Sequence, residues 1–248
     1  MANGICVYAE SYNGELETVA AELVSAAKGL AETTKEKVQA IVLSDHAEEL
    51  VKELDKLGVD EIYAVKADHD ITLQDDAVSA AIAEMLKKIE PSAVLVPATP
   101  QGRSIFSRVA MRLGCGMTAD CTEVLAAQRE DGSFYIKQNK PSYGENVFVT
   151  ILTKEGIYPQ MMTVRPGVYA ACEAKESGNA NVTFFDDIKI EKSGVEILEE
   201  LELPEELLEE LLLLELELFC LFALAAASAF AAASAFAAAS ACFRASSA

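Results

Sequence analysis

Phosphate-binding and metal-binding fingerprints are missing from this chain. The sequence has neither GxGxxG nor GxxxxGK(S/T), the two glycine-rich motifs that cradle nucleotide phosphates. None of its six cysteines forms a CxxC pair, and no histidine lies near enough in sequence to suggest a metal site. No Ser/His/Asp or Cys/His nucleophile arrangement can be argued either, so the sequence assigns no catalytic residue.

Basic residues are also scarce. The chain has 20 Lys and Arg against 40 Asp and Glu, a formal net charge of −20. Ten of the glutamates fall in residues 195–217, and the residues before them carry a net charge of −11, ordinary for an acidic soluble domain. Because nucleic acids and anionic membranes attract basic surfaces, this balance argues against both as general partners.

The end of the chain has no glycine, since all 13 glycines lie at or before Gly194. A Glu/Leu-rich run there is followed by the hexapeptide AAASAF, which repeats over residues 225–236 and continues as AAASAC. In a helix, six residues turn through about 600°, so successive Phe side chains point about 120° apart. The repeat therefore builds no single buried stripe.

Three interpretations of this tail, residues 193–248, are open. It is a non-native or frame-shifted C-terminus joined to a truncated gene, a genuine low-complexity helical tail, or a membrane-crossing segment. Residues 218–243 carry no charge, and at about 1.5 Å each they could span a roughly 30 Å hydrocarbon core. Their alanine-rich composition and single basic flank, Arg244, argue against a membrane as partner.

Before the tail, apolar runs alternate with helical patterns. Each of the first strands is followed by apolar positions at helical spacing; the strands are expected at residues 4–9, 38–43 and 61–65. Gly29 lies near the end of the first helix, and Ser44 or Asp45 is expected to cap the second. Such alternation predicts an α/β fold, with a doubly wound, mostly parallel sheet covered by helices on both faces.

The stretch 92–122 is the most informative part of the chain. Its apolar run, Val94 to Val96, is typical of a strand covered on both faces, and Gly102 allows a tight turn after it. A helix then follows on the apolar face Ile105, Phe106, Val109, Ala110 and Leu113. The letters MTADCT predict another strand.

After Gly116 the pattern changes to hairpins. Strands are expected at residues 122–128, 134–139 and 147–153, with Asp131–Gly132 as the turn between the first two. These strands extend the sheet or make an antiparallel flap. One more strand is expected within residues 182–190, and a single domain over residues 1–192.

The run ATPQGRSIFSRVAMRLGCGMTADCT resembles the alpha subunit of electron transfer flavoprotein. That family shows a Gly-Arg pair opening a helix, then Arg-Val-Ala-x-Arg-Leu, then Gly-x-Thr-Ala-Asp-Cys-Thr. The stretch 163–168, TVRPGV, and the opening Ala9–Glu10 and Asn13–Gly14 are similar to the family as well. The resemblance covers residues 1–192 and implies a Rossmann-like, adenine nucleotide alpha hydrolase-like fold.

The resemblance implies an electron carrier rather than an enzyme. Such alpha subunits pair with a beta subunit, and the heterodimer holds FAD, which takes electrons from acyl-CoA dehydrogenase-type flavoenzymes, as in fatty acid β-oxidation. In the family a C-terminal domain of the alpha subunit binds the FAD. Here the glycine-free tail stands in its place, and close approach of backbone to a pyrophosphate generally needs glycines. We therefore expect no FAD on this chain alone.

Three residues are candidates for cofactor binding. Gly102 and Arg103 are expected at a strand-to-helix turn, where free N–H groups can hold an anion, although a turn glycine beside a surface arginine explains them without any ligand. Arg165, held on a Pro-Gly turn, either faces a partner or flavin domain or simply ends a plain turn. Arg108 and Arg112 share a helix face and either pair with local carboxylates or anchor an interface.

A second hypothesis has the same α/β domain acting as a flavin-free module that binds adenine nucleotide or a protein partner. The first residues, MANGICVYAE, begin a strand at once and predict no signal peptide. Free thiols suit a reducing compartment, so the protein is expected in the cytoplasm.

Overall fold

The computed structural model describes residues 2–142, 147–192, 194 and 195. The tail expected over residues 193–248 therefore lies almost wholly outside the described residues, and so does the candidate membrane-crossing stretch 218–243. Among the residues that are described, no helix is both long and apolar enough to cross a membrane.

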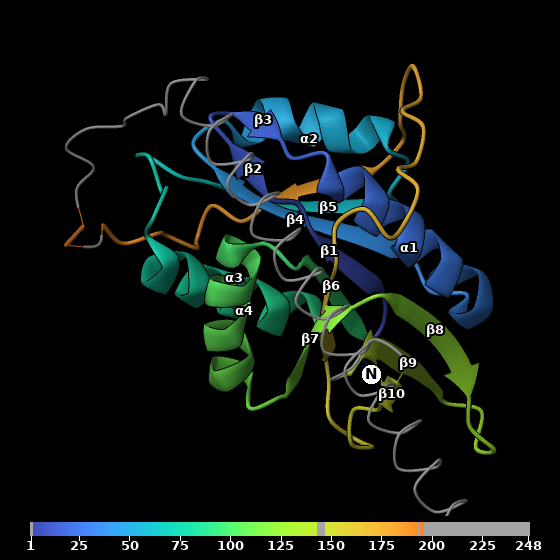
Figure 1. Cartoon of the computed structure of the whole chain (residues 1–248). Helices are drawn as coiled ribbons and strands as arrows, with labels where there is room; N and C mark the ends of the chain where they lie inside the picture. Colours follow the sequence, from blue (N-terminus) through green and yellow to red (C-terminus); the bar gives the residue numbers. More distant parts are fainter. Residues whose placement is uncertain (1, 143–146, 193, 196–248) are drawn as a thin grey trace, which may run out of the picture. The chain divides into compact units, whose positions relative to one another are not determined.

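Helices and parallel strands alternate along the chain (Figure 1). The helices are α1 (Val19–Thr34), α2 (Ala47–Lys56), α3 (Asp75–Ile89) and α4 (Pro100–Leu113). The strands of the central sheet are β1 (Ile5–Tyr8), β4 (Val38–Ser44), β5 (Glu61–Lys66), β6 (Ala93–Pro97), β7 (Met117–Cys121), β11 (Gln160–Val164) and β12 (Asn181–Phe184). Their order is β12-β5-β4-β1-β6-β11-β7, with every neighbouring pair parallel. The expected doubly wound α/β fold is confirmed.

Strand β1 supplies side chains to two hydrophobic cores. Ile5 and Val7 pack with residues of α1 and α2, whereas Cys6 and Tyr8 pack with residues of α3 and α4. Successive strand side chains point to opposite faces of a sheet, and Figure 1 shows α1 and α2 on one face and α3 and α4 on the other. Since both faces are covered, the central strands read as continuous apolar runs.

Two helix boundaries differ from the expectation. Helix α1 continues through Gly29 and ends at Thr34. Gly29 is exposed there, so the helix tolerates it at a modest cost in propensity. Helix α2 follows His46, and neither Ser44 nor Asp45 caps it. Their side-chain oxygens instead accept from the His46 N–H, at 3.0 Å and 3.1 Å, in a tight turn just before the helix.

Two strands were misjudged from the sequence. Strand β11 is buried between β6 and β7, where the sequence predicted no strand, and the turn expected at residues 165–167 follows it. It is short and rich in methionine, and a proline precedes it, so its pattern is inconspicuous. Strand β12 ends at Phe184, well short of Ile190, because the chain then turns and buries Ile188 and Ile190 against the core beside α3 and α4.

The hairpin strands form a flap of their own. Strands β8 (Glu123–Gln128), β9 (Phe134–Pro141) and β10 (Phe148–Ile151) make an antiparallel sheet in the order β10-β9-β8. The expected turn between β8 and β9 is confirmed, with the Asp131 Oδ1 accepting from the Ser133 N–H at 2.9 Å. A smaller hairpin, β2 (Ser11–Tyr12) and β3 (Glu15–Leu16), follows β1.

Gly102 does not form the turn expected of it. It lies inside the first turn of α4, after the N-cap Thr99 and Pro100. A Cβ at Gly102 would lie 2.3 Å from the Pro97 carbonyl oxygen, where real Cβ atoms essentially never lie. The glycine is therefore required because the helix starts directly against the end of β6.

We expect Gly102→Ala to lower the free energy of unfolding by about 1–3 kcal/mol, because the added methyl group overpacks the junction of β6 and α4. The matched control is Gly29→Ala, since nothing lies within 4 Å of a Cβ added at Gly29. That change should raise the free energy by about 0.5–1 kcal/mol. Urea denaturation measures both, and equal effects from the two substitutions would refute the close-approach argument.

Candidate functional site

The connections that leave β1 and β6 run to opposite faces of the sheet. Strand β1 leads through the β2–β3 hairpin to α1, whereas β6 leads directly to α4, and these two helices contribute to different cores. Because β1 and β6 are neighbours, a crevice forms where their connections diverge. Ligands of open α/β sheets bind at such a switch point.

A cavity of about 350 Å³ opens at this edge of the sheet. Its walls come from the segments that follow β1, β4 and β5 and from the first turns of α3 and α4. Most of the lining is polar and includes Ser11, Ser44, Asp45, Asp70, Thr72 and Gln101. Its volume is within the usual range for small-molecule sites.

The β2–β3 hairpin forms one wall of this cavity. Its turn residues Asn13 and Gly14 have positive φ angles of 49° and 78°, the geometry that favours Asn-Gly in two-residue hairpins. A Cβ at Gly14 would lie 3.1 Å from the His46 ring. The turn therefore lies directly against His46, which lines the same cavity.

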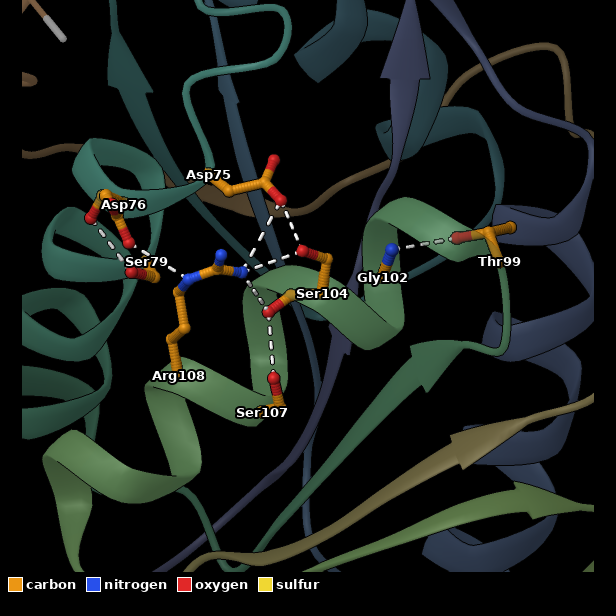
Figure 2. Close-up of polar contacts among 8 residues, drawn as sticks. All are labelled: Asp75, Asp76, Ser79, Thr99, Gly102, Ser104, Ser107 and Arg108. Carbon is orange, nitrogen blue, oxygen red and sulfur yellow. Dashed lines mark hydrogen bonds and ion pairs between the residues drawn. The ribbon is translucent and has the colours of Figure 1, made fainter. Parts of the chain in front are cut away.

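Thr99 ties the two sides of the crevice together. Its hydroxyl donates to the Glu10 Oε2 at 2.7 Å and accepts from the Gly102 N–H at 2.9 Å (Figure 2 shows the second bond). Glu10 is buried, and burial raises the pKa of its carboxyl group; the Thr99 hydrogen bond offsets part of the rise, and the charge of Glu17 adds to it. The Thr99 hydroxyl thus links the end of β1 to the start of α4, because it donates one hydrogen bond and accepts another.

The three predicted cofactor candidates do not converge on the cavity. The Gly102 N–H is occupied by Thr99. Arg103 is exposed, and its Nε donates to the Thr99 carbonyl oxygen at 3.4 Å. Arg165 lies beyond the end of β11 and is paired with Asp120. None of the three lines the cavity, so cofactor binding by them stays a prediction.

Arg165 and Asp120 form a bidentate pair across the ends of β11 and β7. The Arg165 Nε and Nη2 donate to the two Asp120 oxygens at 3.0 Å and 2.6 Å. The hydrogen bond and charge of Arg165 hold the pKa of the Asp120 carboxyl below its ordinary value, with smaller contributions from Lys140 and Arg103. Asp120 has a φ of 64°, and its N–H donates to the Thr163 Oγ1 at 2.8 Å. The ion pair therefore holds the irregular end of β7 against the end of β11.

Arg108 pairs with local carboxylates, which was one of the two expectations for it (Figure 2). Its Nε lies 2.9 Å from the Asp76 Oδ1, and its Nη1 lies 3.5 Å from the Asp75 Oδ2. The same Nη1 donates to the Ser104 Oγ at 2.7 Å, and that hydroxyl donates to Asp75. These contacts join the start of α3 to α4 beneath the cavity, whereas Arg112 is exposed.

Comparison with known proteins identifies the family. The Electron transfer flavoprotein domain matches residues 5–189, which include every strand of the central sheet and the flap. The chain belongs to the electron transfer flavoprotein family. Its resemblance to that family, noted in the sequence, is therefore confirmed.

Relatives in the electron transfer flavoprotein family carry several names. The chain is 32% identical over 195 residues to an electron transfer flavoprotein subunit alpha of Clostridium acetobutylicum, covering 78% of this chain and 55% of the relative. It is 34% identical over 182 residues to the subunit alpha of Thermoanaerobacterium thermosaccharolyticum, covering 73% and 54%. A third relative is lactate dehydrogenase (NAD(+),ferredoxin) subunit LctC of Acetobacterium woodii, at 32% over 197 residues, covering 79% and 46%. The chain spans about half the length of these curated relatives.

The flavin of this family does not fit the crevice between β1 and β6. FAD carries a pyrophosphate, which needs free N–H groups or basic side chains. The lining instead presents the carboxylates of Asp45 and Asp70 and contains no Lys or Arg, and Thr99 already occupies the Gly102 N–H. A place for FAD must therefore be sought outside this crevice.

We expect Arg165→Gln to lower the free energy of unfolding by about 0.5–1 kcal/mol at pH 7, because the pair is partly exposed. Since the folded-state pKa of Asp120 is lowered, this stabilisation is present above the ordinary carboxyl pKa and is lost as the pH falls. The difference between the two proteins should thus shrink below about pH 4. Urea denaturation at several pH values measures it; a difference independent of pH would contradict the charge argument.

Proposed function

We propose that this chain supplies the N-terminal α/β domain of an electron transfer flavoprotein alpha-type subunit and docks on a beta-type subunit. The match to the family domain over residues 5–189 carries the proposal. The assembled protein would relay electrons through a bound FAD. In this role the described residues serve as scaffold and interface and perform no side-chain catalysis.

The redox partners are the least specific part of this proposal. Acyl-CoA dehydrogenase-type flavoenzymes are the donors that we propose. The names of other relatives point to alternatives, since they include Protein FixB of Clostridium saccharobutylicum and an acryloyl-CoA reductase electron transfer subunit beta of Anaerotignum propionicum. An electron transfer role is stated in the name of the Anaerotignum relative, as in the names of the subunit alpha relatives, and no single substrate is common to the names.

Strand β10 has the properties of a docking surface. Among the strands that the structure describes, it pairs only with β9, so it is an edge of the flap. Val147 and Phe148 are 55% and 67% exposed, and Val149 and Leu152 are exposed as well. An exposed apolar edge strand promotes aggregation in a protein that has no binding partner, and such a surface marks an interaction site. A beta-type subunit is the occupant that the family suggests.

The visible absorption spectrum of the purified protein tests the carrier function. We expect the complex with a beta-type subunit to show stoichiometric flavin absorption and the chain alone to show none. A colourless complex that still assembles fully would instead favour the flavin-free binding module. Failure to assemble with any beta-type subunit would remove the docking proposal itself.

We expect Phe148→Lys to weaken the complex with the beta-type subunit by more than about tenfold, because truncating or charging a central apolar contact typically costs 2 kcal/mol or more. The control is Met111→Lys, since Met111 is 81% exposed on α4. Surface plasmon resonance with the immobilised beta-type subunit measures both. Equal affinities for the two variants and the unchanged protein would place the interface elsewhere.

A further inference from the structure

The cavity at the switch point has an acidic lining. Asp45 and Asp70 line it, His46 pairs with Asp45, and the lining contains no Lys or Arg. Beyond the lining, Arg108 is already engaged by both Asp75 and Asp76. An anion entering here would meet carboxylates at short range, whereas a cation would be attracted.

Asp70 keeps one carboxylate oxygen for a ligand, whereas both oxygens of Asp45 have neighbours. The Asp70 Oδ1 accepts from the Thr72 N–H at 2.9 Å and from the Thr72 hydroxyl at 2.6 Å. These bonds lower the pKa of the Asp70 carboxyl and keep it ionised. The Asp45 Oδ1 accepts from the Ser44 hydroxyl and from the His46 N–H, each at 3.1 Å. The Asp45 Oδ2 lies 3.6 Å from the His46 Nε2, whereas no hydrogen bond or ion pair of the described residues uses the Asp70 Oδ2.

Tyr8 presents an unpaired hydroxyl group to the cavity. It is 5% exposed, its ring packs on Phe106 at an interplanar angle of 56° with centroids 4.8 Å apart, and it lines the cavity. Its hydroxyl has no hydrogen-bond partner among the described residues, and burial and the charges of Glu10 and Asp75 raise its pKa and keep it protonated. The hydroxyl oxygen can therefore accept a hydrogen bond from a donor that enters the cavity.

We propose that this cavity binds a small organic amine of the diamine or polyamine class. One ammonium group donates to the free Oδ2 of Asp70 and to the Tyr8 hydroxyl, and a second lies beside the Asp45 carboxylate. The methylene chain between the ammonium groups lies along the apolar part of the wall, which is formed by Leu43, Ile71 and Val78. A linear amine combines the two properties that this lining requires, positive ends and an apolar middle.

Other ligand classes suit the cavity less well. Nucleotide phosphates would lie against carboxylates without any basic residue in the wall. A resident metal ion is not favoured either, because no cluster of three or more His, Cys, Asp or Glu is spaced for a metal within the part of the chain that the structure describes. The amine proposal is independent of the proposed electron-carrier function, since it concerns the chain without a beta-type subunit.

Isothermal titration of the full chain with spermidine, at about 0.15 M salt to screen diffuse attraction, tests the proposal. We expect saturable binding at one site, weakened about tenfold by Asp70→Asn, because a hydrogen bond to a charged group is lost. Tyr8→Phe should weaken binding severalfold. Both changes preserve the local structure. The Asn side chain can still accept from Thr72, and the Phe ring can still pack on Phe106 in the same tilted arrangement.

The matched control is Asp131→Asn on the flap. Asp131 accepts from the Ser133 N–H and hydroxyl at 2.9 Å and 2.6 Å, the same arrangement that Asp70 makes with Thr72. This variant should bind spermidine as the unchanged protein does. Equal binding by all four proteins would show only attraction to an acidic chain and would overturn the proposal, as would tighter binding of adenosine monophosphate than of spermidine.

Discussion

Burial of β1 and β6 on both faces is the constraint on which the described structure depends. Their side chains alternate between two cores, so each strand must be apolar throughout and must be covered by helices on both sides. The helices can cover both faces only if the two connections diverge, and that divergence creates the crevice. Where β6 leads into α4, a Cβ at Gly102 would lie 2.3 Å from the Pro97 carbonyl oxygen, so no side chain fits there.

The sequence predicts the central fold well because the pattern of apolar residues that indicates each strand or helix lies within that element. Doubly covered strands are continuous apolar runs, and the helices between them repeat their apolar positions at helical spacing. The predictions are wrong where three-dimensional contacts decide the outcome. Strand β11 is recognisable only beside β6 and β7, which are distant in sequence. The role of Gly102 depends on the Pro97 carbonyl oxygen, which is near in sequence but approaches Gly102 only in the geometry of the β6–α4 junction.

The site was less predictable than the fold. Gly102 and Arg103 are candidates because a strand-to-helix turn can hold an anion, and Arg165 is one because a Pro-Gly turn can hold it toward a partner or flavin domain. In the structure, Thr99 already binds the Gly102 N–H and Asp120 already pairs with Arg165. Tyr8 and Asp70 line the cavity, yet neither belongs to a motif. They lie 62 positions apart and meet only because β1 and β5 end at the same edge of the sheet. A crevice whose location is typical of nucleotide sites can therefore have the opposite electrostatic preference.

Strand β10 has a consequence for how the cell must make this protein. Among the strands that the structure describes, β10 pairs only with β9, so its other edge is unpaired, and the side chains of Phe148 and Val149 are exposed beside it. Without an occupant for this edge, copies of the chain would meet one another edge to edge, and such pairing propagates. Under the proposed docking on a beta-type subunit, balanced synthesis of the two chains would protect against aggregation as well as supply the complex.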